Sequence, residues 1–272
     1  MTNEAWLEFC RAAVEDLRGV LASMPTRHER EGEVGTGAGG DETTEVDAAA
    51  EAAIVARLER LHEAEGLDFH LVSEELGERV FGDAPDLRVI VDPIDGSLNA
   101  KRNIPYFSFS FAVAEGTAMK DVVFGFVYDF GSGEEWTATR GGGAWLNGER
   151  LGAVLPKEEI EILALEATVA AAVADKAEAF AGFARRLRIM GSLALSLCNL
   201  AAGRVDAVCS LKEARAVDIA AAQLLLREVG MPIMFVDAAP FEIGPLDTAA
   251  RSPVAAAGTQ EVCERLAGIV AT

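Results

Sequence analysis

The sequence VIVDPIDGS at residues 89–97 places two carboxylates three positions apart, directly after three apolar residues. A short apolar run of this kind is typical of a buried strand. Asp92 and Asp95 therefore stand where a strand ends and a helix could begin. Pro93 restricts the backbone, so both carboxylates and the carbonyl group of Ile94 can face one cation.

The end of the same segment is suited to an anion. Gly96 and Ser97 offer backbone N–H groups and a hydroxyl at the start of the helix that could follow, and such an arrangement binds phosphate. A structural explanation competes with this one, because an aspartate beside a proline turn is a common helix cap. For a single Asp-Pro-x-Asp-Gly segment, the structural explanation would be the better one.

Two other segments also place acids at the end of a predicted element. Glu74 and Glu75 follow residues 69–72, whose alternation of apolar and polar side chains predicts a second strand. Asp218 opens an apolar helical stretch, residues 217–229, where it could merely cap the helix. Mg²⁺ takes oxygen ligands and keeps waters for a substrate phosphate, so a cluster of cations needs carboxylates from several element ends. We therefore favour metal binding over capping.

These motifs resemble those of the inositol monophosphatase superfamily. Glu74 and Glu75 are similar to the family's acid pair, and residues 92–99 are similar to its signature Asp-Pro-(Ile/Leu)-Asp-Gly-(Ser/Thr)-x-Asn. Residues 217–220, Val-Asp-Ile-Ala, are similar to its late Trp-Asp-x-Ala element. Further family-like segments are residues 41–47 and 141–148. The resemblance spans nearly the whole chain, in the family's order.

Within the superfamily, the chain is most similar to the archaeal branch that hydrolyses both fructose 1,6-bisphosphate and inositol monophosphate. The features that carry this likeness are the glycine-rich segment 34–41, Ser97 in place of the commoner threonine, and residues 215–218 without the tryptophan. The resemblance implies Mg²⁺-dependent hydrolysis of a small sugar or polyol phosphate. A phosphatase of 3′-phosphoadenosine 5′-phosphate or NADP, from the same superfamily, is the alternative.

The resemblance also implies roles for the acids. Glu74, Asp92 and the carbonyl oxygen of Ile94 would hold one Mg²⁺, while Asp92, Asp95 and Asp218 would hold a second. A third, weaker site would use Glu74 with water molecules. Two or three ions per active site are therefore expected, and Mn²⁺ could replace Mg²⁺.

The resemblance assigns the remaining catalytic groups to the phosphate and the attacking water. Ser97, hydrogen-bonded to Asp47, would orient the nucleophilic water, and the amides of Gly96 and Ser97 would contact the phosphate. A structural role is the alternative for Asp47, because this residue could cap the helix that follows it.

Five further residues are expected to contact the substrate. By resemblance, Gly191, Ser192 and Leu193, at a strand-to-helix turn, would contact the sugar. Lys212 and Arg215 are basic residues close to a predicted metal ligand, and Arg215 is suited to hold a second, non-reacting phosphate. Both could equally be solvated loop charges.

The composition limits the class of protein and its partners. The chain has 272 residues, of which 50% are hydrophobic, so it is not disordered and can bury a sizeable core. Its formal net charge of −20 argues against a nucleic-acid partner, because phosphates would be repelled. Lysine is scarce and arginine supplies most of the positive charge, a pattern that fits either a salt-adapted proteome or a GC-rich genome. By resemblance, the protein is expected to be a homodimer.

The sequence also favours a cytoplasmic location. No apolar run approaches the roughly 20 residues that cross a bilayer. Residues 1–11 lack the basic segment and apolar core of a secretory signal. The four cysteines are scattered, which indicates reduced, buried thiols, and the three histidines lie too far apart for a zinc site.

The expected elements fall into two halves. Residues 6–24 and 47–62 predict helices, whereas residues 27–41 predict a mobile loop. Residues 106–147 alternate short strands with turns, which predicts an antiparallel sheet.

From residue 160 onwards, strands alternate with helices. The expected strands are residues 160–169, 187–190, 205–209 and 233–236, and the expected helices are residues 175–186, 192–202, 217–229 and 260–269. Such alternation predicts an α/β half. We therefore expect an N-terminal α+β half with the metal-binding motifs, residues 1–155, and a C-terminal α/β half, residues 156–272, with a junction near Leu155. This agrees with the layered αβαβα sugar-phosphatase fold that the resemblance implies.

Two other classes of protein compete with a phosphatase. Gly35, Gly37 and Gly40 match the G-x-G-x-x-G spacing of a nicotinamide-binding Rossmann fold, but charged residues stand where that motif needs an apolar strand and helix. A catalytically inert scaffold of the phosphatase fold would have lost at least one metal ligand. The acid set is complete, which argues against the scaffold.

Overall fold

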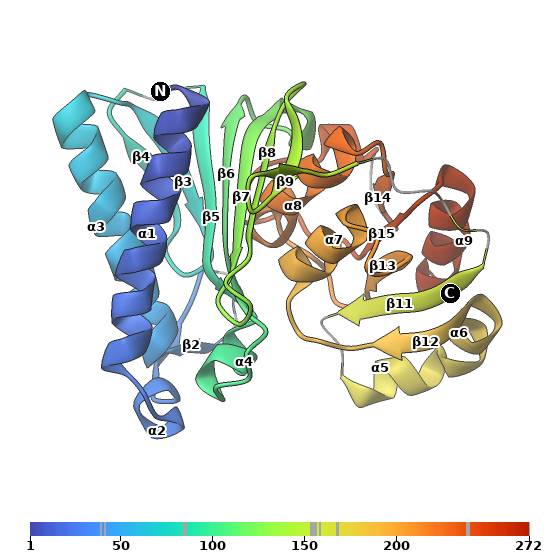
Figure 1. Cartoon of the computed structure of the whole chain (residues 1–272). Coiled ribbons are helices and arrows are strands. Elements are labelled where there is room, and N and C mark those ends of the chain that lie inside the picture. The colour runs from blue at the N-terminus through green and yellow to red at the C-terminus, as the bar shows by residue number, and fades with distance from the viewer. Residues whose placement is uncertain are drawn as a thin grey trace.

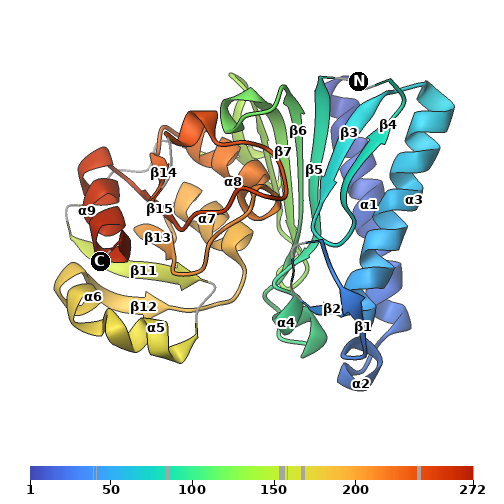
Figure 2. The ribbon, with the colours of Figure 1, turned by 180° about the vertical axis from the view of Figure 1, so that it is seen from behind.

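The computed structural model describes residues 1–38, 40, 42–83, 86–152, 157, 159–166, 169–237 and 240–271. In this part of the chain, helices and sheets alternate in five layers, seen from opposite sides in Figures 1 and 2. The layers are helices α1 (Asn3–Ser23) and α3 (Glu45–Glu65), a first sheet, helices α7 (Leu193–Ala201) and α8 (Ala216–Glu228), a second sheet, and helices α5 (Ala170–Asp175), α6 (Ala177–Phe183) and α9 (Gln260–Ala271). The expected layered αβαβα fold is confirmed.

The first sheet has eight strands within the described residues, in the order β10-β9-β8-β7-β6-β5-β3-β4. Their bounds are β3 (Phe69–Ser73), β4 (Gly77–Phe81), β5 (Leu87–Asp95), β6 (Ser108–Glu115), β7 (Val122–Asp129), β8 (Glu135–Thr139), β9 (Gly143–Leu146) and β10 (Glu149–Arg150). Strand β3 is parallel to β5, and the other neighbours are antiparallel. The antiparallel sheet expected over residues 106–147 is confirmed.

Helices α1 and α3 cover the outer face of this sheet (Figure 1) through a core rich in aromatic rings. Trp6 and Phe9 of α1 contact Phe111 of β6, with ring centroids 5.6 and 5.4 Å apart. Tilted ring contacts of this kind add to the stabilisation that burial of the rings provides. The expected helices at residues 6–24 and 47–62 are confirmed.

Helices α7 and α8 form the middle layer, between the two sheets. Both are buried almost all round, because α7 contacts strands of both sheets and α8 packs between the first sheet and α7. Gly125 of β7 allows this close packing. A Cβ atom there would lie 2.7 Å from the carbonyl oxygen of Ala221 in α8.

The second sheet has five strands in the described part of the chain, in the order β12-β11-β13-β15-β14. Their bounds are β11 (Ile160–Glu166), β12 (Ala184–Arg188), β13 (Ala207–Ser210), β14 (Ile233–Phe235) and β15 (Val254–Ala257). Strand β15 is antiparallel to its neighbours β13 and β14. It was not expected, because its three alanines have a low strand propensity, but all four of its residues are buried.

The helix expected over residues 175–186 is partly wrong. Helices α5 and α6 occupy the region only up to Phe183, and residues 184–188 form the edge strand β12. Phe180 and Phe183 are buried in the core beneath the second sheet, which fixes where the helix ends. Beyond it, Arg186 pairs with Glu161 of β11 at 3.0 Å, an interaction between neighbouring strands.

The mobile loop expected at residues 27–41 is also corrected. It contains a short helix, α2 (Arg27–Arg30), and a strand, β1 (Glu33–Thr36), which pairs with β2 (Glu42–Thr44). Arg30 accounts for the regular structure of this segment, because its buried guanidinium donates to the carbonyl oxygens of Leu21, Met24 and Ala100. Asp41 lies outside the described residues.

The two halves of the chain share one core. Residues of α7 and α8, from the C-terminal half, pack against strands of the first sheet. The expected junction at Leu155 lies outside the described residues. Gly35 lies in β1, which is followed by the antiparallel β2, so the nicotinamide-binding motif lacks its βαβ setting. Among the described residues, no helix is long and apolar enough to span a membrane.

Candidate active site

The predicted site residues come together in one cleft of about 540 Å³. The cleft lies where β3 and β5 of the first sheet end, opposite the end of β13 in the second sheet and the start of α8. The predicted residues that line it are Asp47, Glu74, Asp92, Ile94, Asp95, Gly96, Ser97, Gly191, Leu193, Lys212, Arg215 and Asp218. Ser192 is the exception.

Strand β5 delivers the two aspartates and the turn that follows them. It does not end before Asp92, as the sequence suggested, but continues through a bulge to Asp95. Gly96 then takes a φ of 95° and precedes helix α4 (Ser97–Lys101). A Cβ atom on Gly96 would lie 2.9 Å from the carbonyl oxygen of Gly191, so only glycine fits this turn.

Ser192 lies behind Asp95 rather than in the cleft. It is 1% exposed, and its hydroxyl donates to Oδ2 of Asp95. The backbone N–H of Ala194 donates to the same oxygen at 3.0 Å. These bonds fix the carboxylate of Asp95 against the start of α7.

Arg215 contacts two of the predicted metal ligands. Its Nη2 lies 2.5 Å from Oε1 of Glu74 and 2.8 Å from Oδ1 of Asp218. Asp218 also accepts the backbone N–H of Arg215 at 2.7 Å, so it does cap α8. Capping and membership of the acid cluster are therefore compatible for this residue.

The hydrogen bond expected between Ser97 and Asp47 is not formed among the described residues. The Ser97 hydroxyl donates instead to the carbonyl oxygen of Ile94, at 3.0 Å. Oδ2 of Asp47 accepts from the hydroxyl of Thr44 at 2.5 Å, which caps α3. Oδ1 of Asp47 is buried and has no hydrogen-bond partner in the described part of the chain.

Burial and mutual repulsion disturb the ionisation of the acids. Burial raises the pKa of Glu74 and of Asp95 to about 7, and the neighbouring Asp218 adds to both shifts. Burial also raises the pKa of Asp92 well above its usual value, with further increases from Glu74 and Asp95. Burial by itself would lower the pKa of Arg215, but Asp218 and Glu74 raise it. The cleft therefore holds more buried negative charge than one guanidinium offsets.

The carboxylates and the carbonyl group of the cleft are the ligand types that hard cations prefer, although other contacts occupy several of these groups. Among the described residues, no three acidic, histidine or cysteine side chains converge as the ligands of one ion. Arg215 stands between Glu74 and Asp218, while Ser192 and Ala194 hold Asp95. Carboxylate oxygens that lie close together in a buried cleft and repel one another are those that Mg²⁺ or Mn²⁺ would satisfy.

One supporting carboxylate was missed in the sequence. Glu166, at the end of β11, is 1% exposed and accepts the backbone N–H of Gly191 at 2.6 Å and the hydroxyl of Ser196 at 2.6 Å. Burial raises its pKa to about 6. It shapes the turn before α7, and an acid at the end of the apolar run 162–165 was the signal that could have found it.

The chain belongs to the inositol monophosphatase family, whose sequence profile matches residues 3–271. A fructose-1,6-bisphosphatase/inositol-1-monophosphatase of Methanothermobacter thermautotrophicus is 35% identical over 240 residues, which cover 85% of this chain and 84% of that protein. A solved structure of an inositol monophosphatase–fructose 1,6 bisphosphatase has a TM-score of 0.81 and 27% identity, and covers 97% of this chain and 99% of that one. The expected resemblance, including its archaeal branch, is confirmed.

A lesser match is a bifunctional NADP phosphatase/NAD kinase of Methanococcus maripaludis. It is 29% identical over 217 residues, which cover 71% of this chain and 37% of that protein. All three relatives carry a phosphatase name. Membership of the family makes this chain a phosphatase that acts on a small phosphorylated compound.

Proposed function

We propose that the protein is a Mg²⁺-dependent phosphatase of small sugar or polyol phosphates, with fructose 1,6-bisphosphate and inositol monophosphate as substrates. The observation that carries this proposal is the meeting of Glu74, Asp92, Asp95 and Asp218 in one buried cleft, beside the amides at the start of α4. The names of the archaeal relatives supply the two substrates.

Each acid has a proposed part in holding the cations. Glu74, Asp92, Asp95 and Asp218, with the carbonyl oxygen of Ile94, would hold two or three Mg²⁺ ions, and Mn²⁺ could replace them. When bound, the cations would activate a water molecule and neutralise charge on the phosphate and on the leaving oxygen. Because Arg215 now pairs with two of these acids, metal binding would have to compete with its guanidinium.

The other residues would bind and orient the reactants. The backbone N–H groups of Gly96 and Ser97 would bind the phosphate. The Ser97 hydroxyl would orient the attacking water, and Asp47 has an unpartnered oxygen that could accept a hydrogen bond from that water. Gly191 and Leu193 would contact the sugar.

The basic residues at the cleft would bind a second phosphate. Lys212 is exposed at the rim, and Arg215 lies deeper in the cleft. We infer that they hold the non-reacting phosphate of a bisphosphate. Ser192 would act indirectly, since it positions Asp95.

The mouth of the cleft favours a second candidate substrate class. Leu98, Val169 and Ile189 line it and are 60%, 71% and 51% exposed. An apolar surface beside a phosphate site could pack against a nucleobase. The NADP phosphatase among the relatives is consistent with this alternative, as is hydrolysis of 3′-phosphoadenosine 5′-phosphate.

A phosphate-release screen with Mg²⁺ tests both candidates. The substrates are inositol 1-phosphate, fructose 1,6-bisphosphate, 3′-phosphoadenosine 5′-phosphate and NADP, each with an EDTA control. The proposal expects release from the first two, abolished by EDTA. Preference for the two nucleotides would support the alternative, and undiminished release after exhaustive EDTA treatment would exclude the metal mechanism.

We also infer, from the family resemblance, a homodimer in the cytoplasm. Light scattering of the purified chain at several concentrations tests the first point, with twice the chain mass of 28.8 kDa as the expected result. Fractionation of the source cells tests the second.

A further inference from the structure

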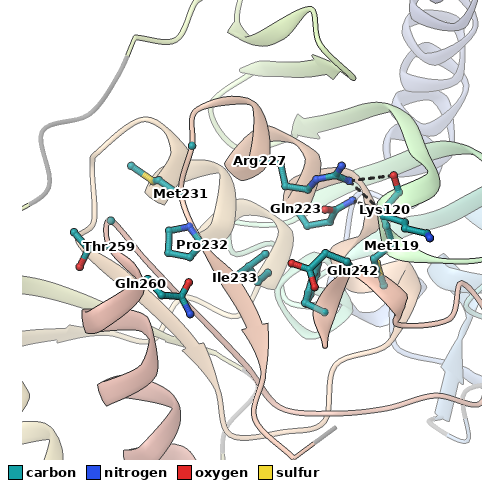
Figure 3. Close-up of a pocket in the computed structure, with 13 residues that line it drawn as sticks. Met119, Lys120, Gln223, Arg227, Met231, Pro232, Ile233, Glu242, Thr259 and Gln260 are labelled. Carbon is teal, nitrogen blue, oxygen red and sulfur yellow. Dashed lines mark hydrogen bonds between the residues drawn. The ribbon is translucent and has the colours of Figure 1, made fainter. Parts of the chain in front are cut away.

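A second pocket, remote from the acid cluster, has a volume of about 490 Å³. It lies between the C-terminal half of α8, strand β14, the start of α9 and the short helices η1 (Met119–Asp121) and η2 (Phe241–Ile243). Figure 3 shows its side chains. Gln223, Arg227 and Lys120 lie together at one end, Thr259 and Gln260 lie at the other, and Pro232 and Ile233 lie between them.

The most informative side chain in this pocket is Gln223. It is 0% exposed, and its Nε2 donates to the carbonyl oxygens of Met119 at 3.2 Å and Ala220 at 3.3 Å. These acceptors fix the orientation of the amide. Its Oε1 is buried and has no hydrogen-bond partner among the residues that the structure describes. A buried acceptor without a donor costs about 1–3 kcal/mol, which favours a small rotation of the side chain that would bring Oε1 to an N–H or O–H group in the pocket.

Two cations stand beside this acceptor. Arg227 follows Gln223 by one helical turn, and its Nη1 donates to the same Met119 carbonyl oxygen at 3.2 Å. Lys120 is exposed at the same end of the pocket. Within the described residues, neither Arg227 nor Lys120 forms an ion pair, although the chain carries a formal net charge of −20.

The remainder of the pocket offers an acidic group, an apolar middle and a helix start. Glu242 lines the pocket near its cationic end (Figure 3) and can accept a hydroxyl hydrogen. Pro232 and Ile233 form the middle. At the far end, Thr259 caps α9 by accepting the backbone N–H of Val262 at 3.3 Å, and the first amides of this helix favour an oxygen atom.

We propose that this pocket binds a small phosphorylated polyol, at a site distinct from the acid cleft. Arg227 and Lys120 together match the double negative charge of a phosphate monoester, and the guanidinium can bind two of its oxygens. Once Gln223 rotates toward the pocket, a hydroxyl next to the phosphate donates to its Oε1. Further hydroxyls meet Glu242 and the start of α9.

Glycerol 3-phosphate, which has a phosphate beside two hydroxyls, is the probe for this site. It is titrated into the full chain by calorimetry in the presence of EDTA, where the buried acids of the cleft repel phosphate. The expected result is one site per chain with a dissociation constant of about 1 mM or tighter. Because the assay contains no divalent metal, the result does not depend on whether the cleft hydrolyses phosphate esters.

Charge variants test whether the binding belongs to this pocket. Arg227→Gln and Lys120→Gln are each expected to weaken the probe at least about tenfold, on the scale of a charge-assisted hydrogen bond. Arg79→Gln is the matched control, because Arg79 lies on β4 and pairs with Glu59 at 2.8 Å, away from the pocket. The control should bind as the parent does. Equal losses in all three variants, or no heat of binding in the parent, would overturn the proposal.

Gln223→Met tests whether a hydroxyl of the ligand donates a hydrogen bond to Gln223. The substitution keeps the side-chain volume and removes both Oε1 and the Nε2 donor to the carbonyl oxygens of Met119 and Ala220. It should weaken glycerol 3-phosphate several-fold more than inorganic phosphate, which lacks the neighbouring hydroxyl and shares only the effect of the lost Nε2 bonds. Equal weakening of both anions would contradict the part assigned to Oε1.

Discussion

At the scale of single residues, the sequence identifies the acids of the cleft, whereas the contacts that hold them depend on the fold. The spacing of Asp92 and Asp95 is visible in one short motif. The contact between Arg215 and Glu74 joins residues 141 positions apart, across the meeting of two sheets. No local pattern encodes such a contact. For the same reason the Asp47–Ser97 bond was wrongly expected, since each side chain has a nearer backbone or hydroxyl partner.

Asp95→Asn should abolish phosphate release and leave the fold intact. Burial raises the pKa of Asp95 to about 7, so ionising this side chain in the metal-free folded protein costs free energy that a neutral amide avoids. We expect the melting temperature in EDTA to rise by about 2 °C or more, which corresponds to ~1 kcal/mol. Calorimetry and a phosphate assay measure both effects. Inactivity with a markedly lower melting temperature would instead assign Asp95 to the scaffold around Ser192.

The metal-free protein should lose stability as the pH rises. Burial raises the pKa of Glu74 and Asp95 to about 7 in the folded state. A raised carboxyl pKa stabilises the fold below the pKa of the unfolded chain, about 4, and that contribution is lost as the pH rises through the folded value. Melting temperatures in EDTA at about pH 5 and pH 8 test the sign. A melting temperature that increases over this range would contradict the account, and added Mg²⁺ should restore stability at the higher pH.

Arg215→Ala should separate the two proposed substrates. A second phosphate needs its own cations, so hydrolysis of fructose 1,6-bisphosphate should fall by about 1.5–3 kcal/mol in kcat/KM, the scale of a charge-assisted hydrogen bond. Inositol 1-phosphate, with no second phosphate, should be affected less. Steady-state kinetics on both substrates decide the point. Equal losses would mean that Arg215 acts through its contacts with Glu74 and Asp218.

At the scale of secondary-structure elements, a strong hydrophobic pattern predicted helices and strands correctly, whereas a weak pattern did not. The amphipathic α1 and the apolar α8 were both expected. Strand β15 was missed, because its alanines form a strand only through their place between β13 and β14 in the interior of a sheet. The ordered segment α2–β1 was missed because Arg30 donates to carbonyl groups of two other segments, the end of α1 and α4.

Gly125→Ala should destabilise the packing of α8 on the first sheet. The added Cβ would lie 2.7 Å from the carbonyl oxygen of Ala221, and overpacking of this kind costs about 1–3 kcal/mol. Gly19→Ala in α1 is the control, because a Cβ there meets nothing within 4 Å. The control should stabilise the protein by about 0.5–1 kcal/mol, since alanine favours a helix interior. Denaturant unfolding measures both, and equal effects would contradict the packing argument.

At the scale of the whole molecule, the five layers followed from the family resemblance rather than from periodicity. The pattern of strands and helices predicts two halves, but it does not reveal that α7 and α8 cross over to pack against the first sheet. That crossing creates the cleft, because it brings the start of α8 to the ends of β3 and β5. The same helix carries Asp218 at the cleft and Arg227 at the second pocket.

The central claim is that the buried acids of the cleft are a metal centre for phosphate hydrolysis. The most direct test counts the Mn²⁺ ions bound per chain by electron paramagnetic resonance, in parallel with phosphate release from fructose 1,6-bisphosphate and inositol 1-phosphate. The account predicts two or three ions per chain, activity that rises with their binding, and loss of at least one ion together with all activity in Asp95→Asn. Full Mn²⁺ binding and unchanged turnover in Asp95→Asn would contradict it.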